Sequence, residues 1–119
     1  MNSPQAVESF AALAHEYRLA ICGMLFEAGP KGLNAGAVAA RLKLPASSLS
    51  FHLQQLLRAG LITRKRQGRE LIYAVDFARM NGVIRYLMEE CLGGVTSGSA
   101  TGSEPLDETK RIRKSSQAA

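Results

Sequence analysis

The sequence has few cysteines, few histidines and no long apolar run, and each shortage excludes a class of protein. Its 119 residues include 2 cysteines and 2 histidines, too few thiols for a disulfide framework. No other histidine or cysteine lies at metal-ligand spacing from His52, which argues against a metal site there. No apolar run approaches the ~20 residues that span a bilayer, and residues 1–9 lack the basic start and apolar centre of a signal peptide. We therefore expect a cytoplasmic protein with reduced thiols and no membrane partner.

Groupings of residues typical of catalysis are also missing. We find no nucleophile–base pair, no carboxylate pair and no phosphate-binding loop, so we do not expect an enzyme. The length and the 46% hydrophobic content fit one globular domain, which we assign to residues 1–94. Residues 95–119 hold few large apolar residues, and we interpret them as a disordered tail. A domain this small buries only about 60–70% of its unfolded surface, so a dimer would help complete its core.

Residues 33–75 carry the most informative pattern. Two short helical patterns meet at Leu44-Pro45, and a basic alternating segment then turns at Gln67-Gly68 and returns as a second strand. This order predicts a winged helix-turn-helix: a mainly α fold of five helices with a small two-stranded β-hairpin, the wing. The second of the two helices contains no acidic residue, and none occurs between residues 46 and 65. A helix that lies against DNA phosphates is expected to have this composition.

The outward face of that helix supplies the candidate DNA contacts. At about 100° per residue, Leu49, Leu53 and Leu56 share one side and are expected in the core. The candidates that point outward or lie on the flanks are Ser47, Ser48, Ser50, Phe51, His52, Gln54, Gln55 and Arg58. Serine and glutamine can bond phosphates or base edges, and glutamine can bind adenine through two hydrogen bonds. Phe51 either packs against the wing or the preceding helix, or contacts a thymine methyl group.

The predicted wing is basic. Arg64, Lys65, Arg66 and Arg69 surround its turn, and such a hairpin tip fits the minor groove or the flanking phosphates. The alternative is a solvated hairpin without a ligand. The net charge of +5 is modest, so the placement of these cations carries the argument.

The remaining residues predict three more helices. Residues 6–14 form a short apolar helix, and residues 15–28 form a second one that His15 opens. The buried stripe expected for the second helix is Leu19, Ile21, Cys22, Leu25 and Phe26. Asn34 is expected to cap the third helix, and Asp76 to cap the last one, which runs to about residue 92. The apolar stripe of the last helix is wide enough to serve both its own core and a partner subunit: Phe77, Met80, Val83, Ile84, Leu87, Met88 and Cys91.

Three motifs make the chain resemble the ArsR/SmtB family of bacterial metal- and stress-responsive repressors. They are LAHEYRLAICGMLFEAG, GLNAGAVAARLKLPASSLSFHLQQLLRAGLI and RQGRELIYAV, in that order, within roughly residues 11–94. The resemblance implies a winged helix-turn-helix homodimer that dimerises through its first and last helices. It also implies repression of an operon through a double-stranded DNA operator, with release when an inducer binds.

The two thiols, Cys22 and Cys91, indicate which inducers the chain could bind. The last helix most resembles a group whose Cys-Cys pair and a downstream Cys bind trivalent arsenic; Cys91 matches the first of the pair, but Leu92 replaces the second. A three-thiolate site cannot form here, so an arsenite or related metalloid effector would use Cys91, with Cys22 as the available second thiol. Another group senses persulfide or oxidants through one Cys on each of these helices, about one residue from Cys22 and Cys91. The alternative for Cys22 is a buried, inert thiol.

A second class of function stays open at this point. Winged helices can serve as protein-interaction modules without binding DNA or an effector. The basic wing and the acid-free helix favour DNA.

Overall fold

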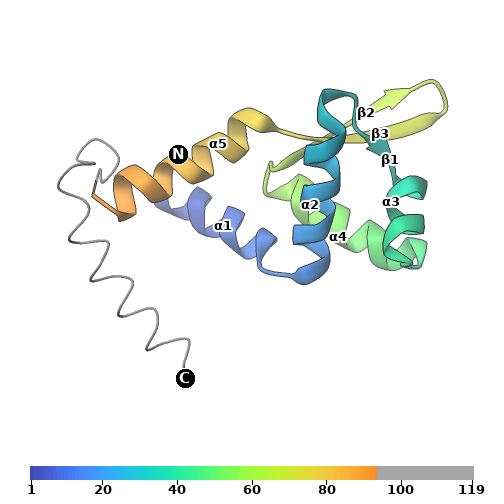
Figure 1. The fold of residues 1–119 in the computed structure, drawn as a ribbon. Coiled ribbons are helices and arrows are strands. Elements are labelled where there is room, and N and C mark those ends of the chain that lie inside the picture. The colour runs from blue at the N-terminus through green and yellow to red at the C-terminus, as the bar shows by residue number, and fades with distance from the viewer. Residues whose placement is uncertain (94–119) are drawn as a thin grey trace. The chain divides into compact units, whose positions relative to one another are not determined.

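A computed structural model describes residues 1–93 and shows a helical protein with one small sheet (Figure 1). The chain divides after Val83 into two units, of which the first holds four complete helices and the sheet. Its helices are α1 (Ser3–Leu13), α2 (Glu16–Ala28), α3 (Ala35–Leu42) and α4 (Ala46–Arg58), and its strands are β1 (Leu33–Asn34), β2 (Ile62–Gln67) and β3 (Glu70–Val75). A 3-10 turn, Gly29–Lys31, follows α2; α5 (Phe77–Tyr86) follows the sheet and continues as a π-helical segment, Leu87–Cys91. The predicted mainly α winged helix-turn-helix is confirmed, and the proposed tail lies outside the described residues.

Side-chain caps set where the helices begin. Asn2 and Gln5 form a capping box at the start of α1, in which each side chain bonds the other residue's backbone N–H. The His15 side chain accepts the N–H of Tyr17 at the start of α2, and Asn34 accepts that of Ala37 at the start of α3. Asp76 accepts the N–H of Arg79 at 3.0 Å. The predicted caps at Asn34 and Asp76 are therefore confirmed, and His15 opens α2 as expected.

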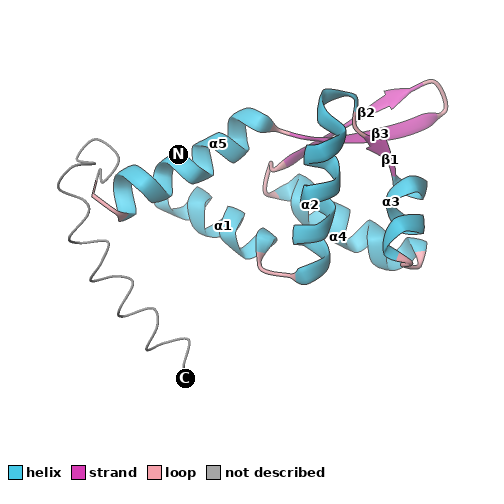
Figure 2. Ribbon diagram, viewed as in Figure 1, coloured by secondary structure: helices cyan, strands magenta, loops and turns pink. Residues whose placement is uncertain are grey.

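The sheet has three strands rather than the expected two. β2 and β3 form the antiparallel wing, with Gln67 opposite Glu70, so that Gly68 and Arg69 make the turn (Figure 2). Gly68 has a φ of +67°, the conformation that such two-residue hairpin turns need and that glycine adopts at little cost. The third strand, β1, pairs Leu33 with Tyr73 on the inner edge of β3. It anchors the wing to the start of α3.

The core of the first unit lies between α2, α3, α4 and the base of the sheet. Leu49, Leu53 and Leu56 of α4 are buried as predicted, and they pack in one cluster with Ile21 and Leu25 of α2. Full burial of each such side chain is worth about 1.5–3 kcal/mol relative to exposure. The predicted stripe of α2 is wrong at both ends, because Leu19 and Phe26 are 57% and 58% exposed. These two residues lie seven positions apart, on the side of α2 that turns away from the cluster.

Among residues 1–93, no helix combines the length and the apolarity that crossing a membrane requires.

Candidate nucleic-acid interface

The recognition helix of the predicted interface is α4, and its outward face is now defined. Leu49, Leu53 and Leu56 fix the helix on the core, so the opposite side is free. Phe51 is 58% exposed on that side. Ser47, Ser50, Gln54 and Arg58 are exposed as well, whereas Ser48 and Gln55 are partly buried. The structure thus gathers most of the sequence-predicted contacts on the outward side of α4, a helix with no acidic residue of its own. Gln55 and Arg58 also line a hollow with Glu8 of α1.

His52 does not belong to this surface. Its side chain is 8% exposed, and its Nδ1 lies 3.2 Å from an Arg18 guanidinium nitrogen of α2. The expectation that His52 flanks the DNA-facing side is wrong, because His52 lies three positions after Leu49 and four positions before Leu56. That spacing places it on the buried stripe of the helix. Desolvation by burial lowers the pKa of His52, and the nearby His15 and Arg18 lower it further.

Phe51 lies beside His52 on α4. Its ring meets that of His52 edge-on, with 5.6 Å between centroids, and more than half of the side chain remains exposed. Phe51 therefore packs partly on its own helix and keeps apolar surface available to a ligand.

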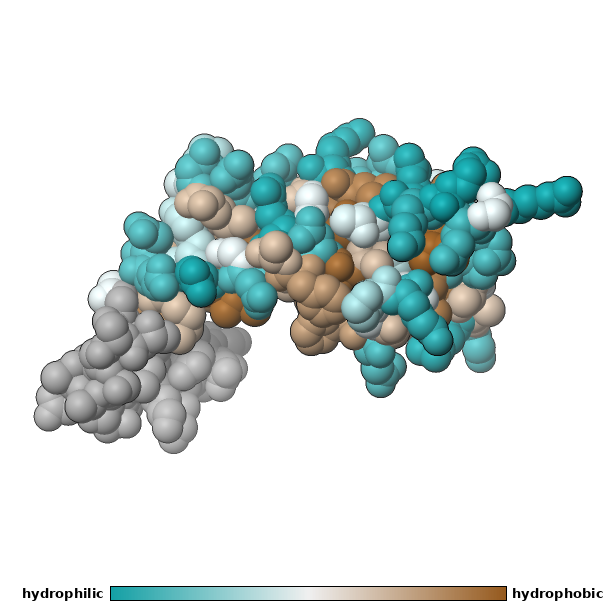
Figure 3. All heavy atoms as spheres, turned by 90° about the horizontal axis from the view of Figure 1, so that it is seen from above, coloured by the Kyte–Doolittle hydropathy of each residue, from teal (hydrophilic) through white to brown (hydrophobic). Residues whose placement is uncertain are grey.

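The wing extends the basic surface beyond α4. Arg64, Lys65, Arg66 and Arg69 are all exposed. Glu70 is the acid nearest to them in sequence, and its carboxylate accepts a hydrogen bond from Asn34 at 3.1 Å. None of the four cations forms a salt bridge with a carboxylate in the described part of the chain. Hydrophilic side chains, drawn in teal, project from the wing at the right of Figure 3.

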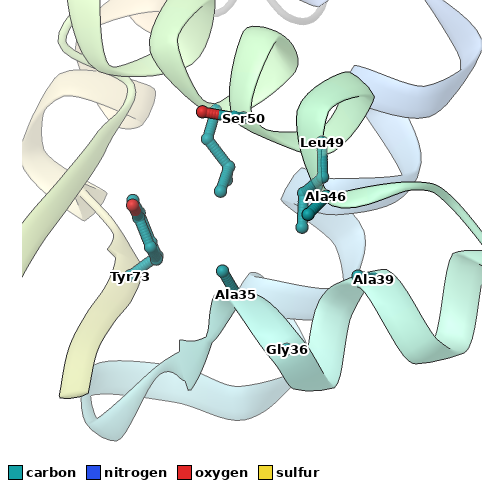
Figure 4. A pocket seen from close by; sticks show the side chains of 8 residues that line it. Ala35, Gly36, Ala39, Ala46, Leu49, Ser50 and Tyr73 are labelled. Carbon is teal, nitrogen blue, oxygen red and sulfur yellow. The ribbon is translucent and has the colours of Figure 1, made fainter.

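A small hollow lies beside α4. Its volume is about 130 Å³, and it opens between α3, α4 and β3. Ala35, Gly36 and Ala39 of α3 line one side, with Ser50 of α4 and Tyr73 of β3 across from them (Figure 4). Ligand pockets generally enclose ~300–1,000 Å³. The hollow is therefore a packing space left by short side chains, and we do not assign it a ligand.

The two cysteines differ in reactivity. Both are free thiols, Cys22 buried and Cys91 exposed. Burial raises the pKa of Cys22 to about 11, so its reactive thiolate form is scarce at neutral pH. No group of three or more His, Cys, Asp or Glu residues within 1–93 is placed to hold a metal ion.

Comparison with known proteins identifies similar regulators. A family described as a helix-turn-helix domain matches residues 13–65. The transcriptional activator HlyU of Vibrio cholerae is 34% identical over 72% of this chain and 77% of its own. The transcriptional repressor PagR of Bacillus anthracis is 33% identical over 73% of this chain and 85% of its own.

Solved structures show the same architecture. An ArsR-like transcriptional regulator from Rhodococcus sp. RHA1 matches with a TM-score of 0.63 and 30% identity, over 92% of both chains. A Mycobacterium bovis protein, Mb0332, matches with a TM-score of 0.58 and 26% identity, over 75% of this chain and 82% of that one. Its structure is described as a homodimeric winged helix-turn-helix DNA-binding domain.

Proposed function

We propose that this chain, which belongs to the ArsR/SmtB family of winged helix-turn-helix transcriptional regulators, represses transcription in the cytoplasm as a homodimer bound to operator DNA. Membership of the family makes the chain a DNA-binding regulator and not an enzyme. Repression, the homodimer, the operator and the effector are the parts that we propose. HlyU is named an activator and PagR a repressor, so the direction of regulation needs its own test.

The main support for DNA binding is that the outward face of α4 and the basic wing follow one another directly along the chain. The outward face of α4 is exposed and free of acidic residues, and the chain leads from it directly into a wing with four exposed cations. Phosphate contacts supply most of the affinity of such proteins, and base contacts supply sequence preference. We assign Arg64, Lys65, Arg66 and Arg69 to phosphates, and Ser48, Phe51 and Gln55 to base edges.

A binding titration tests this function. The full chain is titrated against a labelled DNA fragment from its own promoter region and against a scrambled fragment of equal length. Operator binding predicts an affinity for the promoter fragment ~10³-fold or more above that for the scrambled one. Equal affinity for both fragments, or none for either, would favour the protein-interaction module instead. A reporter gene fused to the promoter, measured with and without the protein, distinguishes repression from activation.

Exposed apolar side chains support the homodimer. Val7 of α1 is 62% exposed. In the second unit, Ile84, Leu87 and Leu92 are 56%, 42% and 46% exposed within residues 84–93. Apolar surface in such amounts on neighbouring turns of a helix usually marks a contact with another chain. Sedimentation at micromolar concentration should show a dimer; a monomer that binds one half-site would contradict the proposal.

We further propose that a thiol-reactive effector, trivalent arsenic or a related metalloid, acts first at Cys91. The support is accessibility: Cys91 is exposed, whereas Cys22 is buried and its raised pKa keeps it protonated. To release DNA, the effector must bind the operator-competent and incompetent dimers unequally.

The test is release from the promoter fragment by arsenite and, separately, by polysulfide. Cys91→Ser should abolish release by the true effector, and Cys22→Ser is the matched variant. If polysulfide but not arsenite releases the parent protein from DNA, and neither variant is released by polysulfide, the result would favour a bridged Cys22–Cys91 pair. Release of the Cys91→Ser protein as readily as the parent would exclude sensing at this thiol.

A further inference from the structure

A polar contact ties the recognition helix to the two helices that precede the helix-turn-helix. Arg18 of α2 reaches His52 of α4 through a terminal guanidinium nitrogen, at 3.2 Å from Nδ1. The same side chain donates its Nε–H to the carbonyl oxygen of Ala12, near the end of α1, at 2.6 Å. One arginine therefore joins α1, α2 and α4.

Two aromatic side chains at the start of α2, one at its N-cap and one in its first turn, lie against the imidazole of His52. The ring of His15 lies 4.5 Å from that of His52 between centroids, and the ring of Tyr17 lies 5.7 Å from it. His15 is itself held, since its Nδ1 accepts the N–H of Tyr17 at 3.1 Å. His52 thus sits in a site that α2 builds around it, with 8% of its surface exposed.

The contact requires a neutral imidazole. An arginine guanidinium has donors and no acceptor, so Nδ1 of His52 must accept and its single proton must lie on Nε2. A protonated His52 would carry N–H groups on both ring nitrogens, and one of them would face the Arg18 cation. Both the hydrogen bond and the favourable electrostatics would then be lost.

We propose that Arg18 and His52 are positioning residues for DNA binding, whose hydrogen bond fixes the rotation of α4 on α1 and α2 while His52 is neutral. The proposal rests on the operator binding proposed above. His52 precedes the core residue Leu53 and follows Phe51, whose exposed ring touches it. A change in how His52 is held therefore moves the outward face directly.

The charged and titratable groups around His52 set the expected pH response. From α2 and its N-cap these are His15, Tyr17 and Arg18. α1 contributes the Ala12 carbonyl through Arg18, and no carboxylate in residues 1–93 forms a salt bridge with Arg18 or His52. The nearby charges that act on His52 are those of His15 and Arg18, and both disfavour its protonation. Operator affinity should fall on acidification, although added positive charge alone would strengthen binding to DNA.

The experiment measures operator affinity of the full chain by fluorescence anisotropy between pH 7.5 and 5.0, at constant ionic strength, because the pKa of His52 lies below its ordinary value of 6.5. The central variant is His52→Asn, because an asparagine Oδ1 can accept the Arg18 N–H near the position of Nδ1 and does not titrate. Since the chain has two histidines, His15→Asn is the matched control. An asparagine retains the cap on α2 and removes only the neighbouring imidazole.

The wild type should lose roughly tenfold in operator affinity, the effect expected of one hydrogen bond to a charged group. His15→Asn should retain that loss and move it to higher pH, because the neighbouring imidazole no longer lowers the pKa of His52. His52→Asn should bind the operator as the wild type does at pH 7.5 and lose less than about twofold at pH 5.0. Arg18→Met should bind more weakly at pH 7.5 with little further pH dependence, and circular dichroism reports whether it folds.

Two results would overturn the inference and leave operator binding intact. One is a wild type that binds the operator equally at both pH values. The other is a His52→Asn protein with the full acid-dependent loss. A wild type without affinity for the promoter fragment at pH 7.5 would instead refute the proposed function, and this inference with it.

Discussion

Replacing Arg64 and Arg66 together by alanine tests the wing most directly. Both side chains are exposed on β2, where they lie opposite Tyr73 and Leu71 of β3. Neither forms a salt bridge with a described carboxylate, so truncation should leave the fold intact. In a homodimer the double variant removes four cations from the predicted DNA surface.

The size of the effect follows from counterion release. Each neutralised phosphate of duplex DNA contributes about 0.9 to the slope of log affinity against log salt concentration. Four lost contacts should therefore flatten the slope by about 3.6. The ratio of wild-type to variant affinity for DNA should therefore be roughly 100-fold smaller at about 200 mM salt than at about 50 mM salt.

The assay is a salt titration of binding to the promoter fragment and to the scrambled fragment. The variant should weaken binding to both fragments alike, because phosphate contacts carry no sequence information. Arg85→Ala is the matched control: it removes an exposed arginine of α5 that pairs with Glu89 at 3.8 Å. An unchanged salt slope in Arg64→Ala/Arg66→Ala, or a loss confined to the promoter fragment, would refute the assignment of the wing to phosphates.

Three further changes test the recognition face, the wing anchor and the buried histidine. Gln55→Ala should reduce discrimination between promoter and scrambled DNA by ~1–3 kcal/mol; an equal loss on both fragments in the same titration would show that Gln55 contacts phosphate. Gly32→Ala should lower the free energy of unfolding in urea by roughly 2–4 kcal/mol. The reason is that Gly32 has a φ of +66° and that a Cβ there would overlap the carbonyl oxygen of Tyr73. Gly23→Ala in α2 is the control: a Cβ there meets open space, so the variant should be neutral or stabilising. The pKa of His52 in the folded state lies below its ordinary value of 6.5, so below that pH the unfolded chain binds more protons than the folded chain. The free energy of unfolding should therefore fall as pH drops from 6.5. His52→Asn should show a smaller fall in the same measurement.

The sequence was sufficient to predict the helix-turn-helix because its signals agree with one another. The stripe of Leu49, Leu53 and Leu56, the cap at Asn34 and the turn at Gly68 each follow from local physical chemistry. His52 was predicted on the flank of the outward face because, at about 100° per residue, it lies at the edge of the core stripe, where spacing alone allows either environment. A histidine can occupy a core stripe when a neighbour satisfies its ring nitrogen, and that neighbour, Arg18, lies 34 residues away.

The sequence pattern could not predict which side of α2 is exposed, nor the presence of the third strand, and the two failures have different causes. α2 carries apolar residues on most of its sides, so periodicity cannot say which stripe faces the core. The structure buries Ile21 and Leu25 and leaves Leu19 and Phe26 exposed. β1 has two residues, too few for an alternating pattern, and exists because β3 offers an unpaired edge to Leu33.

Two kinds of interaction hold α4, and they control different properties of the interface. The apolar stripe stabilises the helix on the core, but hydrophobic contact is non-directional and resists separation more than rotation. The Arg18–His52 hydrogen bond is directional, so it selects one rotation among those that the stripe allows. Base readout depends on which side chains face the groove, whereas phosphate contacts from the flexible side chains of the wing tolerate small rotations. Loss of the hydrogen bond should therefore reduce sequence discrimination before it reduces the affinity for DNA in general.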